Sequence, residues 1–263
     1  HSSGLPHLVG DPEQAPTMQH VAFGDAVGGL NGTAAILTAL WHRQRTGEGQ
    51  FVDLSQVECL FPLAAPGILH QSVHGQSPQR FGNAHPDHAP HGVYPCEGDD
   101  AWVVIQITDE TQWHQLQDVV PSLTAFGDLN DRLAKREAID ACIGTWTQQR
   151  TATKVMQTLQ AAGVTAAKLN NGQELLHEPH LHDRGYLQWL ERDYVGVQPH
   201  PSAPFRTDAG PIPITSPAPT LGQHNHTILG ELLGLSADEL QKLEQQGIVG
   251  TNPRMPQREK STQ

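Results

Sequence analysis

The chain has 263 residues, of which 37% are apolar, and a formal net charge of −12. This length and apolar content predict one large or two smaller domains with a substantial core, and they exclude a disordered protein. The acidic balance, without any basic run, argues against nucleic acid or an anionic membrane surface as a partner. No apolar run approaches the roughly 20 residues that span a membrane.

The cysteines are few and widely spaced. Cys59, Cys96 and Cys142 form neither a disulfide framework nor a zinc-binding spacing. Such cysteine usage is typical of a reducing compartment, so the sequence predicts a cytoplasmic protein.

The first segment with a regular pattern covers residues 23–58. Small and apolar residues fill Ala26 to Arg45, so we expect a helix that is buried on most sides, with Asp25 as its N-cap. Gln50 to Leu54 predicts a short strand. The capping box from Ser55 to Glu58 then predicts the start of a second helix.

A second patterned region begins near Val93. The run from Ala101 to Ile107 is rich in β-branched residues and predicts a buried strand. Apolar residues at helical spacing predict three helices after it, and a short strand closes the region. The helices are expected from Thr108, over Asp131–Gln148 and over Thr151–Ala162, and the strand over Val164–Leu169.

The last third of the chain alternates between irregular and helical segments. Residues 172–220 are rich in Pro and His and predict an irregular, extended connector. Helices are expected over Thr227–Leu233 and after the capping box Ser236–Glu239. The final dozen residues predict a disordered tail.

An ordered pattern runs through the first segment. It consists of Asp25, Gly29, Leu40, Arg43, Thr46, Gly47, Gly49, Gln50, Val52, Asp53 and Ser55. The pattern resembles the family III CoA-transferases, which include formyl-CoA and carnitine CoA-transferases. Further family-like segments at Ser3–Leu5, Arg80–Pro95 and Leu221–Asn225 extend this resemblance over nearly the whole chain.

The resemblance implies an α/β fold in which the chain is the C-terminal portion of a longer protein. Residues 1–70 would form part of a Rossmann-like large α/β domain, and residues 71–92 a connecting loop. Residues 93–175 would form a small α+β domain. Residues 176–263 would be a linker that returns to the large domain and ends in the disordered tail.

The predicted substrate-binding residues lie on the loop at 80–95 and just after the next strand. The resemblance places Asn83, His85 and Tyr94 near the entrance to the acyl site; alternatively, Asn83 and His85 satisfy backbone groups of the loop. Glu110 suits a helix N-terminus through the macrodipole. In the racemase branch of this fold, an acid at the matching position transfers protons.

Histidines recur at three-residue spacing in two places, at His85, His88 and His91 and again at His177 and His180. On a helix this spacing could hold a metal, but Pro86, Pro90 and Pro179 argue against a helix in either place. We therefore predict no metal and no cofactor. The coenzyme A thioester would be a substrate.

Family III transferases are understood to use an aspartate nucleophile, which passes through an acyl anhydride and an aspartyl-CoA thioester. The resemblance places that aspartate upstream of His1, so we predict no catalytic residue within this chain, and we predict that the chain alone is inactive. The implied partners are an acyl-CoA, a carboxylic acid acceptor, and a second subunit in a homodimer or heterodimer.

Three hypotheses remain open at this point. The first is a family III transferase of which this chain is a fragment. The second is an α-methylacyl-CoA racemase-type isomerase of the same fold. The third is a non-catalytic subunit of a two-subunit CoA-transferase. The acyl group and the acceptor acid are not determined by the sequence.

Overall fold

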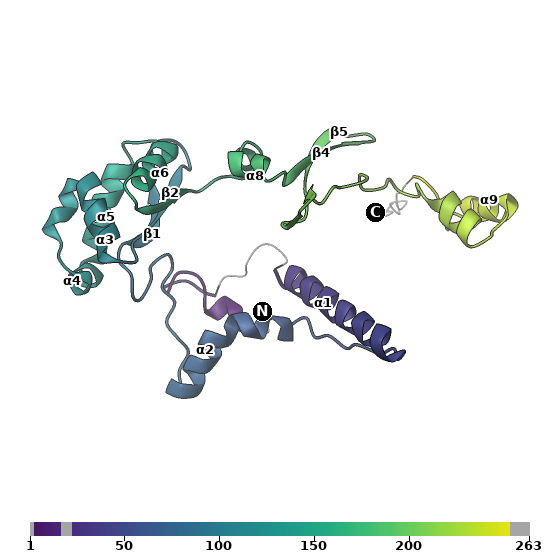
Figure 1. The fold of residues 1–263 in the computed structure, drawn as a ribbon, viewed down its shortest axis with the longest axis horizontal. Coiled ribbons are helices and arrows are strands. Elements are labelled where there is room, and N and C mark those ends of the chain that lie inside the picture. The colour runs from purple at the N-terminus through teal and green to yellow at the C-terminus, as the bar shows by residue number, and fades with distance from the viewer. Residues whose placement is uncertain (1–2, 17–22, 253–263) are drawn as a thin grey trace, which may run out of the picture. The chain divides into compact units, whose positions relative to one another are not determined.

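The computed structural model describes residues 3–16 and 23–252. Its contacts divide the chain into two compact units, His1–Leu169 and Asn170–Gln263, and each unit is described by itself. The tail predicted for the last dozen residues lies mostly outside the described residues, and the domain boundaries drawn from the sequence stay a prediction. Figure 1 shows the elements along the chain and labels the larger ones.

The N-terminal part of the first unit is helical. Its elements are the 3-10 turn η1 (Leu5–His7), helix α1 (Phe23–Thr46), the 3-10 turn η2 (Glu58–Leu60) and helix α2 (Phe61–His74). The predicted first helix is thus confirmed, but Asp25 lies inside its first turn and is not the N-cap. Its carboxylate instead accepts a hydrogen bond from the Gln56 side chain at 2.6 Å.

Helix α1 is largely exposed, so the prediction of burial on most sides is wrong for the described chain. Gly28 is its one buried residue among those described. A side chain at Gly28 would collide with Gln56, which explains the need for glycine there. The apolar side chains of Leu30, Leu37 and Trp41 are 61–73% exposed because no other described element covers them.

The strand predicted over Gln50–Leu54 is absent from the described structure. A strand needs a neighbouring strand to satisfy its backbone groups, and none of the described residues supplies one here. The predicted capping box is only partly present. The Glu58 backbone N–H donates to the Ser55 hydroxyl at 3.4 Å, but the turn η2 begins at Glu58 and the helix only at Phe61.

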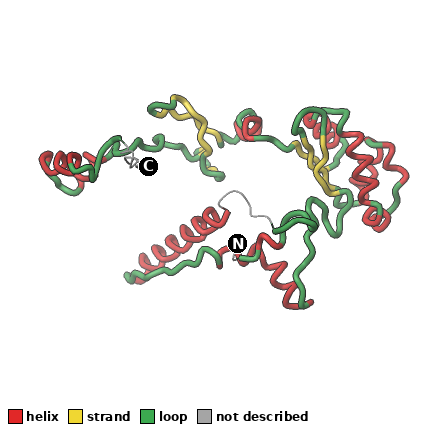
Figure 2. Tube along the Cα trace, turned by 180° about the vertical axis from the view of Figure 1, so that it is seen from behind, coloured by secondary structure: helices red, strands yellow, loops and turns green. Residues whose placement is uncertain are grey.

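A three-stranded antiparallel sheet, in the order β1-β2-β3, forms the centre of the first unit's core. Its strands are β1 (His91–Pro95), β2 (Trp102–Gln106) and β3 (Thr165–Lys168). On β2 the burial alternates, and Val103 and Ile105 are fully buried. Figure 2 shows these strands in yellow beside the red helices of the same unit.

Four helices and a 3-10 turn connect β2 to β3 and supply the rest of that core. They are α3 (Glu110–Val119), η3 (Pro121–Ala125), α4 (Leu129–Ala134), α5 (Arg136–Thr147) and α6 (Ala152–Ala161). Trp113, Leu116, Ile139, Ile143 and Leu159 from these helices pack with β2. The predicted helix over Asp131–Gln148 is divided in two at Lys135, whose backbone leaves the helical region.

The second unit contains short helices and two hairpins. Its elements are α7 (Gly172–Leu175), α8 (Pro179–Asp183), β4 (Leu187–Arg192), β5 (Gly196–Pro201), β6 (Arg206–Thr207), β7 (Gly210–Pro211), the π-helix η4 (His226–Leu232) and α9 (Ala237–Gln245). The prediction of an irregular connector over 172–220 is therefore wrong in part. The capping box at Ser236 is confirmed in full at the start of α9.

Candidate functional site

The loop between α2 and β1 is held by hydrogen bonds to two other segments, residues 10–14 on one side and helices α4 and α5 on the other. On one side, the Gly82 backbone N–H donates to the Gly10 carbonyl at 3.1 Å, and the Arg80 guanidinium donates to the carbonyls of Pro12 and Gln14. Gly82 has φ +58, a backbone conformation that favours glycine. This loop is therefore a pre-shaped segment.

On the other side, two arginines hold the loop by its carbonyl oxygens. Arg136, the first residue of α5, donates to the carbonyls of His85 at 2.7 Å and His88 at 3.1 Å. Arg132 on α4 donates through Nε to the carbonyl of Ala89 at 3.0 Å. We call these contacts the arginine clamp. They fix the part of the loop that carries the histidines.

The imidazole rings of His85, His88 and His91 lie together. The ring centroids of His85 and His88 are 4.4 Å apart and stacked, and those of His85 and His91 are 5.4 Å apart. The backbone N–H of Asp87 donates to Nδ1 of His85 at 3.1 Å. Partial burial, the two neighbouring rings and Arg136 lower the pKa of His85, whereas the Asp87 carboxylate opposes this shift.

Asn83 lies at the start of the same loop, and its side chain is exposed. Its backbone carbonyl accepts from Nδ1 of His91 at 2.8 Å. Among the described residues, none forms a hydrogen bond with the Asn83 side-chain amide. The interpretation that polar loop residues only satisfy backbone groups thus fits Nδ1 of His85 but not the amide of Asn83.

Tyr94 is placed in the core, not on the loop surface. It lies on β1, is 3% exposed, and donates its hydroxyl proton to Oδ1 of Asp140 at 2.6 Å. Burial is the main reason that the pKa values of Tyr94 and Asp140 are both raised. A substrate contact through the Tyr94 hydroxyl stays a prediction, and in this structure that hydroxyl is occupied by Asp140.

Glu110 is the first residue of α3, as its expected affinity for a helix N-terminus requires. Both of its carboxylate oxygens accept from Arg132, at 2.7 and 3.0 Å. The Arg132 side chain is 2% exposed and also lies 4.7 Å from the centroid of the Trp113 ring. Chiefly through these hydrogen bonds, Arg132 holds the pKa of Glu110 below its ordinary value.

The predicted site residues are therefore only partly brought together. Asn83 and His85 share the loop, and Arg132 links that loop to Glu110, whereas Tyr94 lies in the core. Sequence reasoning missed Arg132, Arg136 and Asp140. Their partners lie 22 to 51 residues away in the chain, so no local spacing indicated them.

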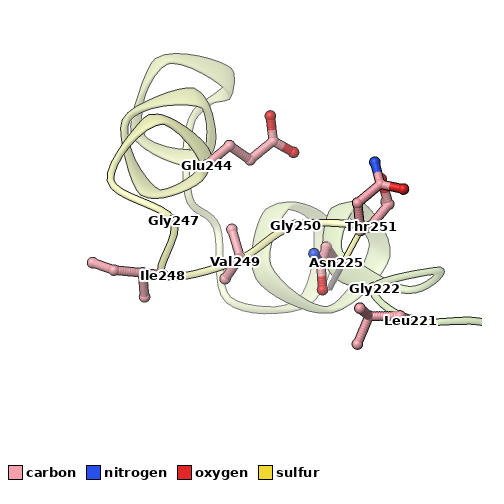
Figure 3. Close-up of a pocket in the computed structure, with 10 residues that line it drawn as sticks. Leu221, Gly222, Asn225, Glu244, Gly247, Ile248, Val249, Gly250 and Thr251 are labelled. Carbon is pink, nitrogen blue, oxygen red and sulfur yellow. The ribbon is translucent and has the colours of Figure 1, made fainter. Parts of the chain in front are cut away.

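Other residues line cavities away from this loop. One cavity, of about 350 Å³, is lined by Ser3, Gly4, His7, Leu8, Ala64, Gly67, Ile68, Gln71, Ser77 and Pro78. Another, of about 700 Å³, lies in the second unit and includes Leu221, Asn225 and Glu244 in its lining. Figure 3 shows these three side chains around the hollow between the η4 and α9 segments.

The described residues contain no group of three or more His, Cys, Asp or Glu that could hold a metal ion. The three cysteines are free thiols. No helix within the described ranges is long and apolar enough to cross a membrane.

Comparison with known proteins identifies the family. Residues 1–225 match the sequence profile of CoA-transferase family III. The chain belongs to this family. Both the resemblance of its motifs and its α/β fold class are thereby confirmed.

Several family III relatives are similar over most of this chain. A probable CoA-transferase of Mycobacterium tuberculosis is 35% identical over 84% of the chain, which covers 28% of that protein. The alpha and beta subunits of succinyl-CoA–L-malate CoA-transferase of Chloroflexus aurantiacus are 28% and 26% identical, each over 94% of the chain. The chain covers 59% and 62% of these two subunits.

The fold comparison agrees. The crystal structure of a CaiB/BaiF family protein from Brucella suis has a TM-score of 0.76 and 28% sequence identity to this chain. The match covers 88% of this chain and 61% of the Brucella protein. The chain thus spans less than two thirds of the length of each of these relatives.

Proposed function

We propose that this chain is part of an acyl-CoA transferase that moves CoA between two carboxylic acids. Membership of CoA-transferase family III carries this proposal. The donor we propose is succinyl-CoA and the acceptor a small dicarboxylic acid, because the two Chloroflexus subunits are named for succinyl-CoA and L-malate.

The proposed mechanism uses an aspartate nucleophile and an aspartyl-CoA intermediate. A mixed anhydride preserves the activation of the thioester, so the same carboxylate can hand CoA to a second acid. We propose that this aspartate lies outside the 263 residues, which cover only part of each relative. In the described chain, Glu110 is a poor substitute because Arg132 binds both of its oxygens.

Asn83 and His85 are the residues we propose for contact with the acyl group. Their support is the loop geometry: the clamp fixes the backbone, the Asn83 amide is exposed, and only one nitrogen of the His85 ring is used within the loop. Loops on rigid supports are common places for binding residues.

The isomerase alternative is less well supported. A proton-transfer acid must change its protonation state during the reaction. Arg132 favours the ionised form of Glu110 and lowers its pKa, which opposes such a cycle. The relatives that are separate alpha and beta subunits support an assembly of two different subunits.

A transfer assay tests the proposal. The chain alone, and the chain joined to the remaining length of a relative, are incubated with succinyl-CoA and labelled L-malate. We expect malyl-CoA only from the longer protein. Borohydride reduces the carbonyl of an aspartyl-CoA thioester to an alcohol, and we expect the reduced residue to be an aspartate outside the chain. Turnover by residues 1–263 alone would contradict the fragment proposal, and epimerisation without an acceptor acid would favour the isomerase.

A further inference from the structure

The hydrogen bond at His85 determines which ring nitrogen carries a proton. The backbone N–H of Asp87 can only donate, so Nδ1 of His85 must accept through its lone pair. In the neutral ring the proton is then on Nε2. A second proton on Nδ1 would break this hydrogen bond, so the geometry favours the neutral ring.

The charged surroundings act in the same direction. The rings of His88, on the same loop, and His91, on β1, lie beside the His85 ring, and Arg136 on α5 binds the His85 backbone carbonyl. Each of these groups opposes a positive charge on His85, whereas the Asp87 carboxylate favours it. In the described chain, no residue accepts a hydrogen bond from Nε2.

We propose that His85 presents a neutral Nε2–H donor to an acyl oxygen of the substrate, and that Arg136 is the residue that positions this donor. The oxygen belongs to a thioester carbonyl or a carboxylate. This inference rests on the proposed function for its substrate, but its structural half can be measured without turnover.

Arg136 suits this positioning role because of its two contacts. Its guanidinium bridges the carbonyls of His85 and His88, so it sets the backbone on both sides of Asp87. The turn that brings the Asp87 N–H to Nδ1 lies between these two anchored carbonyls. A lysine would keep the positive charge but could not make the same planar two-point contact.

The first experiment is NMR of the ¹⁵N-histidine-labelled chain, with the His85 signals assigned from His85→Gln. We expect a neutral ring protonated on Nε2 at neutral pH. In Arg136→Gln and Arg136→Lys, we expect the signal to become a mixture of tautomers, and the pKa of His85 to rise in Arg136→Gln. A ring protonated on Nδ1 in the wild-type chain would overturn the proposal.

The second experiment measures the pH profile of kcat/KM in the protein that transfers CoA. If Arg136→Gln displaces His85, the protein loses the neutral hydrogen bond from Nε2 to the acyl oxygen. We therefore expect kcat/KM to fall about tenfold and the acid limb of the profile to move to higher pH. His85→Gln, which keeps an N–H donor near the Nε2 position, should lose the acid limb but retain more activity than His85→Ala.

Arg184→Gln and His180→Gln are the matched controls. Arg184 also donates to a backbone carbonyl, that of Pro204 at 3.0 Å, and His180 is an exposed histidine on α8. Neither should change the profile. A pH profile for Arg136→Gln that coincides with that of the unmutated protein would overturn the positioning role. If the unmutated longer protein transfers no CoA, the proposed function is overturned, and the NMR result alone decides the tautomer of His85.

Discussion

At the scale of single residues, Glu110 and Arg132 form a pair in which the two partners differ in exposure. The Glu110 side chain is 57% exposed, whereas that of Arg132 is 2% exposed. Removing the carboxylate leaves a buried guanidinium without its counter-charge. The pair therefore matters to stability mainly through Arg132.

We expect Glu110→Gln to lower the free energy of unfolding by about 1–2 kcal/mol, less than for a fully buried pair because water screens Glu110. Arg132 lowers the pKa of Glu110 from 4.5, so this stability is present above pH 4.5 and is lost as pH falls through the lowered value. Urea unfolding at several pH values measures it. Asp118→Asn, an exposed carboxylate on the same helix, is the control, and an equal difference at all pH values would contradict the account.

Tyr94→Phe should destabilise the protein by about 1–3 kcal/mol because the half-buried Asp140 carboxyl loses its donor. Burial already raises the pKa of Asp140, and the loss of this donor raises it further. A raised carboxyl pKa gives stability at low pH that is lost as pH rises, so the penalty should grow with pH. Thermal unfolding at several pH values measures the destabilisation. Tyr194→Phe is the control, because the Tyr194 side chain is 96% exposed. Equal destabilisation by the two variants would contradict a stabilising role for the Tyr94–Asp140 hydrogen bond.

The candidate site shows what sequence patterns can give at this scale. The loop that carries Asn83 and His85 was predictable from its resemblance to the family. The arginine clamp was not, because a guanidinium reaches backbone carbonyls that any residue offers. Tyr94 shows a second limit, since the motif does not tell that this residue lies inside the core; its contact with a substrate stays a prediction.

At the scale of elements, the chain before η4 and the chain after α9 come into contact at Gly222 and Gly250. A side chain at Gly222 would meet the carbonyl oxygen of Gly250, and its φ is +68. Gly234 has a similar φ of +77, but a Cβ added there would have no atom within 4 Å. Substitution of Gly234 therefore tests the backbone strain alone, and substitution of Gly222 tests the same strain together with a steric clash.

We expect Gly222→Ala to cost about 1–3 kcal/mol more than Gly234→Ala, since overpacking adds to the strain that both share. Chemical unfolding followed by circular dichroism measures the difference. If both substitutions lower the free energy of unfolding equally, the backbone at Gly250 moves away from the new methyl group at no cost, and the overpacking account is wrong.

Elements with local signals were predicted well. Thr151 and Ser236 both accept the hydrogen bond expected of an N-cap, and the apolar run of β2 forms the central strand. The hairpin β4–β5 was missed because Pro199 and Pro201 argue against a strand. A two-stranded ribbon tolerates proline where the missing N–H faces away from the partner strand.

At the scale of the whole molecule, the described chain leaves the apolar stripe of α1 uncovered. Leu30, Leu37 and Trp41 recur at helical spacing and are each more than 60% exposed. Contiguous apolar surface of this kind promotes association in water. The prediction of a buried helix was reasonable from composition, but burial depends on partners that composition does not specify.

We expect the isolated chain to bind a hydrophobic dye and to self-associate through this stripe. Leu37→Lys combined with Trp41→Lys should reduce both signals while the helical circular dichroism is retained, because these side chains contact little else. Sedimentation velocity measures the association. Leu169→Lys, 51% exposed outside α1, is the control, and an equal effect of both changes would contradict a role for α1.

The arginine clamp has a consequence for protein engineering. The loop at 80–90 is anchored to α4 and α5, more than 40 residues further along the chain. A loop grafted from another family III member without those helices would lose its anchors and its shape. Chimaeras that exchange this loop should therefore move the loop, Arg132 and Arg136 together.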